Sequence, residues 1–300
     1  NYTSGKLPQL KSGCITVLTG PTASVEDVDW TAGGAEDLRA STAENWSDFI
    51  DLADGNYRPH FATAGSVAEM DADASFSGLR FKSSATATGF TVRKHGTSGS
   101  IALMEASIAI EDEDDDLVAT YSLDLPVTRV ADDLVKLTIP TNKTLVFTEY
   151  TSPGKLEIVG KGTLRLDGTN FVDGYIHVPT DAVARISGLL APRDRKDQGT
   201  GLDQKFKTTL QVLTKGNRRP GILLDNCTIE KPIYINGETG GDMPIRQPLS
   251  DETFAEGGKA WHRITLPAYI SGVNKPMIFF RSTLPAGTKG SVYLYLTWNG

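Results

Sequence analysis

Short apolar clusters without a helical period constrain the fold of this chain most strongly. They are clearest in residues 221–237, GILLDNCTIEKPIYING, where two or three apolar residues alternate with Asp-Asn and Glu-Lys-Pro. A helix would bury residues at positions i, i+3, i+4 and i+7, whereas this spacing fits short strands separated by bends. Pro232 has no amide hydrogen for a sheet ladder and belongs at a corner or a strand start. The segment predicts a coil of short parallel strands.

The same pattern extends over residues 144–242. Strand-like segments such as KTLVFTEY, KLEIVGKG, TLRLDG and GYIHVP follow one another with Gly, Asp or Pro between them. No helical segment intervenes, which excludes a doubly wound sheet. At roughly 20–25 residues per coil, about four or five rungs fit. We therefore expect a short right-handed β-solenoid over residues 144–242, in a mainly β chain, with inward residues stacked as a continuous core.

One segment near the amino terminus carries the period of an α-helix. Residues 1–35 have the pattern of an extended arm, and residues 36–60 that of a helix with its linker. Ser41 can cap this helix, and Glu44 stands three residues later, as in a capping box. Apolar residues then follow at helical spacing: Trp46, Phe49, Ile50 and Ala53. The pattern predicts one N-terminal helix over residues 41–55.

Two further segments are expected to form β-sandwich-like domains that flank the solenoid. In residues 61–143, apolar and polar residues alternate on both sides of the acidic run 111–116. This pattern predicts an antiparallel hairpin with the acidic run at its tip. Residues 243–300 contain strands divided by Gly and Pro turns, but about sixty residues form a poor core on their own. We therefore expect neighbouring chains to complete this C-terminal β-domain as a trimer contact or receptor tip.

Charge and motif content exclude several classes of partner and cofactor. The formal net charge is −7, so we expect no nucleic-acid-binding face. No run approaches about 18 consecutive apolar residues, so we expect no membrane insertion. The acidic run has the alternating aspartates of a calcium loop, but Leu117 stands where the sharp-turn glycine belongs. HExxH, phosphate-loop and Rossmann motifs are missing, and we expect neither a metal nor a cofactor.

Carboxylates in and around one charged stretch are the candidates for chemistry. Hydrolysis of a glycosidic bond needs two carboxyl groups about 5–10 Å apart. On a solenoid such a pair comes from adjacent rungs, whose alignment the sequence does not reveal. The stretch 191–205 mixes aspartates with Arg and Lys, which suits an anionic sugar or a surface loop with internal ion pairs. The weak candidates for catalysis are Asp194, Asp197, Asp203, Asp225 and Glu230.

Aromatic residues near the carboxyl terminus are the candidates for glycan binding. A sugar ring stacks its CH face on an indole or phenol ring. In residues 292–298, apolar residues occupy one set of alternate positions, and Tyr and Thr occupy the other. The candidate platform residues are Trp261, Tyr269, Tyr293, Tyr295 and Trp298. Buried packing, within one chain or between subunits, is the alternative role for each of them.

In its organisation the chain resembles bacteriophage tailspike and tail-fibre proteins. The resemblance lies in the arm with its single helix, the β-rich middle, the rung-like GKGTLRLDG and GILLDNCTIEKPIYING, and the strand-rich terminus GSVYLYLTWNG. It implies a homotrimer on the extracellular surface of a virion, with a solenoid shaft and a β-sandwich tip. It also implies that the protein binds host-surface polysaccharide, and that the arm and helix attach to other virion proteins.

Three functions follow from the residues and the resemblance together. The first is a non-enzymatic spike or fibre that attaches to host-surface glycan. The second is a polysaccharide depolymerase, either a hydrolase or a lyase, on the same scaffold. The third is a purely structural virion component, such as a head-decoration protein or a tail adaptor. The short solenoid favours binding over cleavage, because depolymerases use a long shaft face as their substrate groove.

Overall fold

The computed structural model describes six segments with their side chains and, elsewhere, the backbone of short strands. The six segments are residues 25–34, 37–62, 67–82, 89–111, 116–179 and 181–193. In the other strands, burial is described only for Cys227 and Ile229. Most of this part of the chain is β-structure, which confirms the prediction of a mainly β protein. Within it, no helix is long and apolar enough to cross a membrane.

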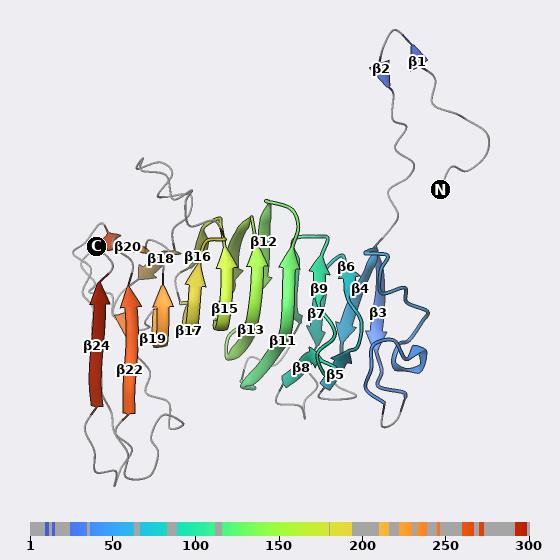
Figure 1. The fold of residues 1–300 in the computed structure, drawn as a ribbon, viewed down its shortest axis with the longest axis horizontal. Helices are drawn as coiled ribbons and strands as arrows, with labels where there is room; N and C mark the ends of the chain where they lie inside the picture. The colour runs from blue at the N-terminus through green and yellow to red at the C-terminus, as the bar shows by residue number, and fades with distance from the viewer. Residues whose placement is uncertain are drawn as a thin grey trace.

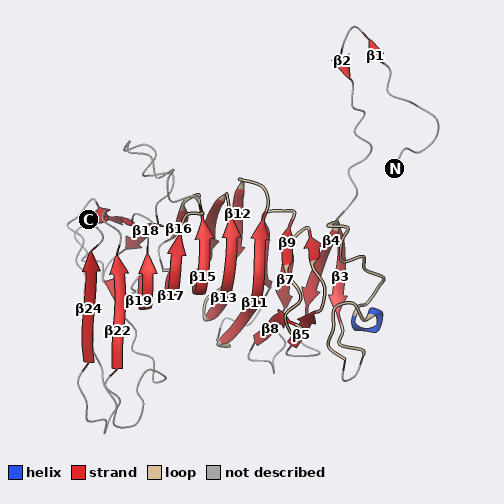
Figure 2. Cartoon of the chain, in the orientation of Figure 1, coloured by secondary structure: helices blue, strands red, loops and turns tan. Residues whose placement is uncertain are grey.

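Two parallel sheets make up the body of the molecule (Figures 1 and 2). From β10 to β20, successive strands alternate between the sheets. Each pair of consecutive strands therefore adds one strand to the ten-stranded sheet and one to the twelve-stranded sheet. The ten-stranded sheet has the order β23 (Ile270–Gly272), β20 (Ile233–Glu238), β18 (Leu210–Lys215), β16 (Ile176–Val178), β14 (Lys155–Val159), β12 (Leu134–Thr138), β10 (Ser107–Glu111), β7 (Leu79–Lys82), β4 (Tyr57–Phe61) and β3 (Glu26–Trp30).

The twelve-stranded sheet follows the same plan. Its main path has the order β24 (Val292–Trp298), β22 (Ala260–Leu266), β19 (Ile222–Ile229), β17 (Val183–Ala191), β15 (Thr163–Val172), β13 (Lys143–Ser152), β11 (Ala119–Arg129), β8 (Gly89–Lys94) and β5 (Val67–Met70). Three short strands complete it: β21 (Ile245–Arg246), β9 (Ile101–Leu103) and β6 (Ala74–Phe76). A separate antiparallel pair joins β1 (Leu10–Lys11) to β2 (Cys14–Ile15).

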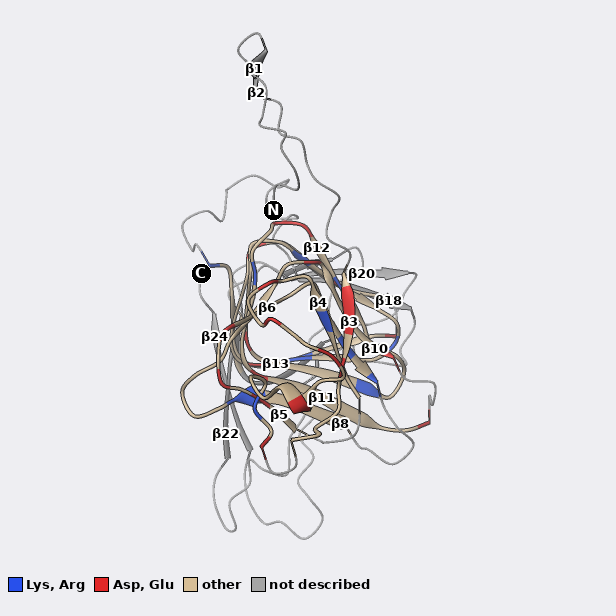
Figure 3. Ribbon diagram, turned by 90° about the vertical axis from the view of Figure 1, so that its right-hand side faces the viewer, with Lys and Arg blue, Asp and Glu red and all other residues tan. Residues whose placement is uncertain are grey.

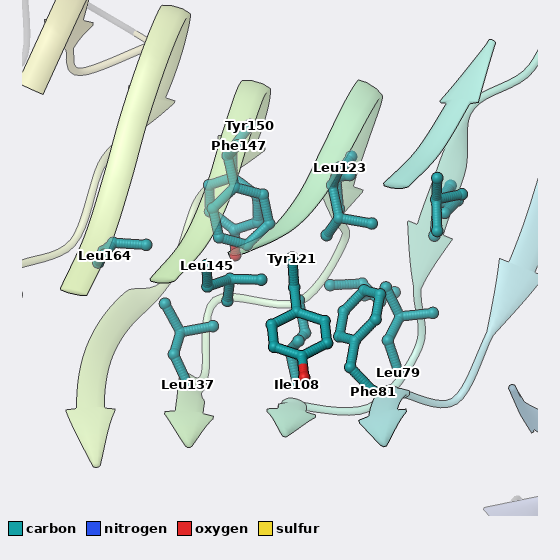
Figure 4. Close-up of a cluster of buried hydrophobic side chains, with 14 of the residues drawn as sticks. Leu79, Phe81, Ile108, Tyr121, Leu123, Leu137, Leu145, Phe147, Tyr150 and Leu164 are labelled. Carbon is teal, nitrogen blue, oxygen red and sulfur yellow. The ribbon is translucent and has the colours of Figure 1, made fainter. Parts of the chain in front are cut away.

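Inward side chains stack from strand to strand and form one core. Every second residue of β11 is buried, as expected for strands that cover a core with one face. One stack runs through the register partners Leu123, Phe147, Leu166 and Ile186. All four are at most 1% exposed. Similar stacks in the ten-stranded sheet join the same cluster, part of which Figure 4 shows.

The long strands of the twelve-stranded sheet bend part-way along their length. The ladder between β13 and β15 is irregular between Phe147 and Thr151, and the ladders from β11 to β13 and from β17 to β19 are irregular as well. Asn170 is fully buried at this bend. Its Oδ1 accepts from the amide of Tyr150 at 3.1 Å, and its Nδ2 donates to the carbonyl of Asp167 at 2.7 Å. The side chain therefore satisfies backbone groups that the irregular ladder leaves without strand partners.

Residues 37–48 close the amino-terminal end of both sheets, and we call them the end cap. On one side the amide of Ser47 donates to the carbonyl of Asp29 in β3 at 2.9 Å. On the other side the amide of Ala40 donates to the carbonyl of Glu69 in β5 at 2.8 Å. Unpaired edge strands promote association with other chains. By bonding to β3 and to β5, the end cap covers edge strands of both sheets that could otherwise pair with another chain.

The α-helix predicted over residues 41–55 does not form. Its only helical turn is the 3-10 helix η1 (Ala43–Asn45). Trp46 instead forms a β-bridge with Trp30, and the two indoles pack edge-on with their centroids 5.0 Å apart. Phe49, predicted on the buried face, is 73% exposed. The prediction was wrong because backbone groups in this segment bond to the sheet edges, and such tertiary contacts override helical propensity.

The antiparallel hairpin predicted within residues 61–143 was also wrong. β10 and β11 flank the acidic run but lie in different sheets: β10 pairs in parallel with β7 and β12, and β11 with β8, β9 and β13. Beyond residue 243, β22 pairs with β19 and β23 pairs with β20, again in parallel. The described strands on both flanks thus continue the two sheets instead of forming sandwich-like domains. Alternation predicts which face a strand buries, but it does not specify the partner strand.

Candidate functional site

Burial in β19 and the register between β19 and β22 show which residues of these strands lie on the outer face of the twelve-stranded sheet. Cys227 and Ile229 of β19 are 2% and 0% exposed, so Thr228 between them stands on the outer face of the sheet. Thr228 is in register with Thr265 of β22. Alternate positions of a strand share a face. Trp261 and Arg263 therefore occupy the outer face of β22, as Thr265 does.

The same outer face continues onto β24. β22 and β24 pair along their whole length, with Trp261 opposite Tyr293 and Arg263 opposite Tyr295. We call the outer positions of these two strands the aromatic–arginine face: Trp261, Arg263, Thr265, Tyr293, Tyr295 and Thr297. The other set of positions on β24 holds Val, Leu, Leu and Trp, which suits the core side of the sheet. Stacking residues, a cation and hydroxyls are thus brought to one place on adjacent strands.

The predicted platform residues divide between the faces of these strands. Trp261, Tyr293 and Tyr295 belong to the aromatic–arginine face. Trp298 is in register with Leu266 and belongs to the opposite face, while Tyr269 lies outside the described residues. Arg263 and Thr265 were missed by the sequence prediction. Their signal was the alternation within AWHRITL, where Trp, Arg and Thr occupy every second position.

Of the carboxylates predicted for catalysis, only Asp225 falls on a described strand. Asp194, Asp197, Asp203 and Glu230 lie outside the described residues. Asp225 stands at the irregularity of β19, where the ladder to β17 slips between the partners of Ile186 and Gly188.

Across this irregularity two residues, Asp225 and Asn226, stand against the single residue Ser187, whose partner in β15 is Asp167. Two strand spacings separate the two carboxylate-bearing backbones by about 9–10 Å. Asp167 is already engaged, because Nε of Arg165 donates to its Oδ1 at 2.8 Å.

A second surface is formed by β3 and β4, whose acidic and basic residues are coloured red and blue on the ribbon in Figure 3. Nε and Nη2 of Arg58 donate to the Asp27 carboxylate at 2.6 and 3.0 Å, and this guanidinium lowers the pKa of Asp27. His60 lies between two carboxylates, with Nε2 3.4 Å from Asp27 Oδ1 and Nδ1 3.3 Å from Asp29 Oδ1. Asp27 and Asp29 of β3 thus lie beside Arg58 and His60 of β4. They join β3 to β4 across the register pairs Asp27–Arg58 and Asp29–His60.

A third group surrounds Glu69 at the edge of the twelve-stranded sheet. His95 Nδ1 lies 2.6 Å from Glu69 Oε2, and Arg93 Nη2 donates to Glu69 Oε1 at 2.5 Å. The bond to His95 and the bonds to Arg93 lower the pKa of the Glu69 carboxyl. These bonds connect β5 to β8 and to the turn after it.

A polar hollow of about 400 Å³ lies next to this group. Its lining includes Asp71, Asp73, Lys94, Ser98 and Ser100, and no aromatic ring. Both carboxylates have local partners, since Ser41 Oγ donates to Asp71 at 2.5 Å and Ser100 Oγ donates to Asp73 at 2.7 Å. The hollow offers hydrogen bonds but no stacking surface for a sugar ring.

The aromatic–arginine face is the strongest candidate of these surfaces. It combines aromatic residues with a hydrogen-bonding cation on adjacent strands. The arginines and carboxylates of the other surfaces contact one another, a histidine or a hydroxyl. Among the residues that the structure describes, no group of His, Cys, Asp or Glu is arranged to hold a metal ion. No family model, curated protein or solved structure matches the chain.

Proposed function

We propose that this protein is an attachment protein of a bacteriophage particle, which binds host-surface polysaccharide without cleaving it. The observation that carries the proposal is the alignment of Trp261 with Tyr293, and of Arg263 with Tyr295, on the outer face of adjacent strands. Aromatic rings stack on the CH faces of sugars. Arginine and threonine supply the directional hydrogen bonds that orient a hydroxylated ligand. Such a face can hold successive units of a saccharide chain.

We propose further that the two sheets wind as one right-handed β-solenoid, which continues on both sides of the predicted residues 144–242. The alternation of successive strands between two parallel sheets supports this proposal. Parallel strands of one sheet are joined by right-handed crossovers in nearly all proteins. A solenoid gives a rigid, elongated body that carries the aromatic–arginine face at one end of its strand order, away from the end cap.

A homotrimer on the extracellular surface of the virion is the proposed assembly. β24 ends the strand order of its sheet, so one of its edges lacks a neighbouring strand among the described residues. Soluble proteins cover such edges or blunt them, and a closed ring of identical subunits is one way to do so. We expect a native mass about three times that of one chain in light scattering after size exclusion. A mass that stays that of one chain at all concentrations would contradict the trimer.

The binding function is tested by adsorption to host cells. Trp261→Ala and Tyr295→Ala each remove one stacking ring and are expected to weaken adsorption about tenfold or more while the native mass is unchanged. The matched control is Phe49→Ala, which removes an exposed aromatic ring beside the end cap. Trp298→Ala is expected to lower thermal stability instead, because its register places it on the core side. Normal adsorption by both face variants would overturn the proposed platform.

Cleavage of the same polysaccharide is a second candidate, favoured by the placement of Asp225 two strands from Asp167. Their backbone spacing approaches the range for the carboxyl groups of inverting glycosidases, about 6.5–9.5 Å. The enzyme would release new reducing ends or unsaturated sugars, and Asp225→Asn would abolish them. Unchanged polysaccharide after prolonged incubation would leave binding as the function.

A purely structural role in the particle makes a different prediction. Deleting residues 1–24 leaves β3 and the end cap in place. Loss of incorporation into particles, together with normal glycan binding by the purified protein, would identify this segment as the attachment to other virion proteins. Normal incorporation would show that the segment is not needed for assembly.

A further inference from the structure

We infer that the aromatic–arginine face binds an anionic polysaccharide, with Arg263 recognising a carboxylate carried by the sugar. This inference rests on the proposed function and adds the chemical class of its ligand. Arg263 is in register with Tyr295, and Trp261 and Thr265 stand two positions before and after it on the same face. A cation at the centre of an aromatic face is suited to a ligand that carries a negative charge beside a sugar ring.

The charge of this face supports an anionic ligand. Its outer positions hold one arginine and no acidic residue, although the whole chain has a formal net charge of −7. On an acidic protein a neutral saccharide needs no such cation, whereas an anionic one would be repelled without it. Arginine is also the side chain whose planar fork matches a carboxylate with two parallel hydrogen bonds.

Other arginines occupy the same side of the sheet. Register partners run from Arg165 to Arg185, then to Leu223, and from Leu223 to Arg246. Leu223 lies between the partners of buried Ala184 and Ile186, so this column belongs to the outer face. Arg263 lies on the same outer face but outside this column, because β22 meets β19 at Thr228 and not at Leu223. The column shows that arginine recurs on the outer face of this sheet, where Arg165 pairs with Asp167.

The test compares one polysaccharide with and without its charge. The full chain is titrated against purified bacterial capsular and O-chain glycans, half with a carboxylate in the repeat and half neutral. Any acidic glycan that binds is then tested after its carboxyl groups have been chemically reduced to alcohols. We expect binding to acidic glycans and a loss of about tenfold to hundredfold on reduction, the range for a hydrogen bond to a charged group.

Variants of Arg263 locate the charge on the protein. Arg263→Gln is expected to weaken binding of the acidic glycan by the same factor, with little effect on its reduced form. Arg263→Lys should recover only part of this loss, because lysine keeps the positive charge but lacks the planar guanidinium that binds a carboxylate with two parallel hydrogen bonds. The control Arg93→Gln removes one positive charge from β8 of the same sheet, where Arg93 pairs with Glu69, and should leave binding unchanged.

The outcomes separate this inference from the proposed function. Equal binding of the acidic glycan and its reduced form, or full binding by Arg263→Gln, would overturn the anionic ligand and leave glycan attachment standing. If the protein bound only neutral glycans, and Trp261→Ala lost this binding, the anionic ligand would again be overturned and glycan attachment would stand. Binding to no glycan at all would overturn both.

Discussion

At the scale of single residues, buried amide side chains hold the irregular parts of the backbone. Asn45 of the end cap is fully buried; its Oδ1 accepts from the amide of Gly34 at 2.9 Å, and its Nδ2 donates to the carbonyl of Arg39 at 2.9 Å. Asn170 does the same at the bend of the twelve-stranded sheet. A buried backbone group that loses its partner keeps the full cost of its desolvation. Loss of either asparagine side chain is therefore expected to lower the free energy of unfolding, because buried backbone groups would lose their hydrogen-bond partners.

Replacing Asn170 should destabilise the fold. Asn170→Ala leaves the buried amide of Tyr150 without its acceptor and should lower the free energy of unfolding by about 1–3 kcal/mol. Urea-induced unfolding measures the change. The control is Thr169→Ala, since this neighbouring side chain is exposed and its loss should cost no more than about 0.5 kcal/mol. Equal effects of the two substitutions would show that the side-chain bonds of Asn170 do not hold the bend.

Glu69 should make stability depend on pH in the acid range. His95 and Arg93 lower its pKa in the folded protein, so at a given acid pH the unfolded chain binds more protons at this position. Stability contributed by Glu69 is therefore present above the ordinary glutamate pKa of about 4.3 and is lost as pH falls through the lower, folded value. Unfolding midpoints between about pH 6 and pH 3 measure this slope.

The matched variant for this prediction is Glu69→Gln, which keeps the shape of the side chain but cannot titrate. Its stability should fall less steeply with acid than that of the unchanged protein. A slope identical in both proteins would assign the acid sensitivity to other carboxylates.

At the scale of elements, the bend depends on two stacked glycines. Gly168 and Gly188 are register partners in β15 and β17, with φ of 65° and 104°. These left-handed conformations are costly for residues that carry a Cβ atom. A Cβ at Gly188 would also overlap the carbonyl oxygen of Gly168. The two strands can stack through the bend only because both positions lack side chains.

Gly188→Ala should therefore lower the free energy of unfolding by more than backbone strain alone would. We expect a loss of about 2–4 kcal/mol in the free energy of unfolding, from strain and steric overlap together. Gly96→Ala separates the two causes, because Gly96 also has a positive φ, of 63°, but a Cβ at this position would meet no atom within 4 Å. That control should lose only about 1–2 kcal/mol. Equal losses would remove close stacking as the reason for glycine at the bend.

At the scale of the whole molecule, each strand depends mainly on its neighbours in the stack. β13 is paired on both sides, by β11 and β15, whereas β24 is paired by β22 alone among the described strands. In stacked architectures, stability is approximately a sum of each repeat and its contacts with adjacent repeats. Local opening should therefore be easiest at β24.

Hydrogen exchange should show this gradient. We expect amides of β13 and β15 to exchange at least about tenfold more slowly than those of β24 in the isolated chain. Exchange followed by mass spectrometry of peptides measures the difference strand by strand. Equal protection of β24 and β13 would mean that the last strand is held as firmly as the centre, as a subunit contact at its edge would do.

The sequence by itself determined the β-rich composition of the fold, the short strands between polar breaks, and the aromatic residues near the carboxyl terminus. These features depend on local periodicity: alternate residues of a strand share a face, so Tyr293 and Tyr295 could be placed together from spacing alone. The same local reasoning failed for the end cap, where the helical spacing around Trp46 competed with pairing to distant strand edges.

Only the tertiary structure decided which strands are partners. A hairpin at the acidic run and two parallel strands in different sheets have the same alternation, because periodicity records a face and not a neighbour. Register across distant segments brought Arg263 beside Tyr295, Asp225 within two strands of Asp167, and Trp298 onto the core side. These placements depend on backbone hydrogen bonds between residues far apart in the chain, and no short stretch of sequence contains both halves of such a pair.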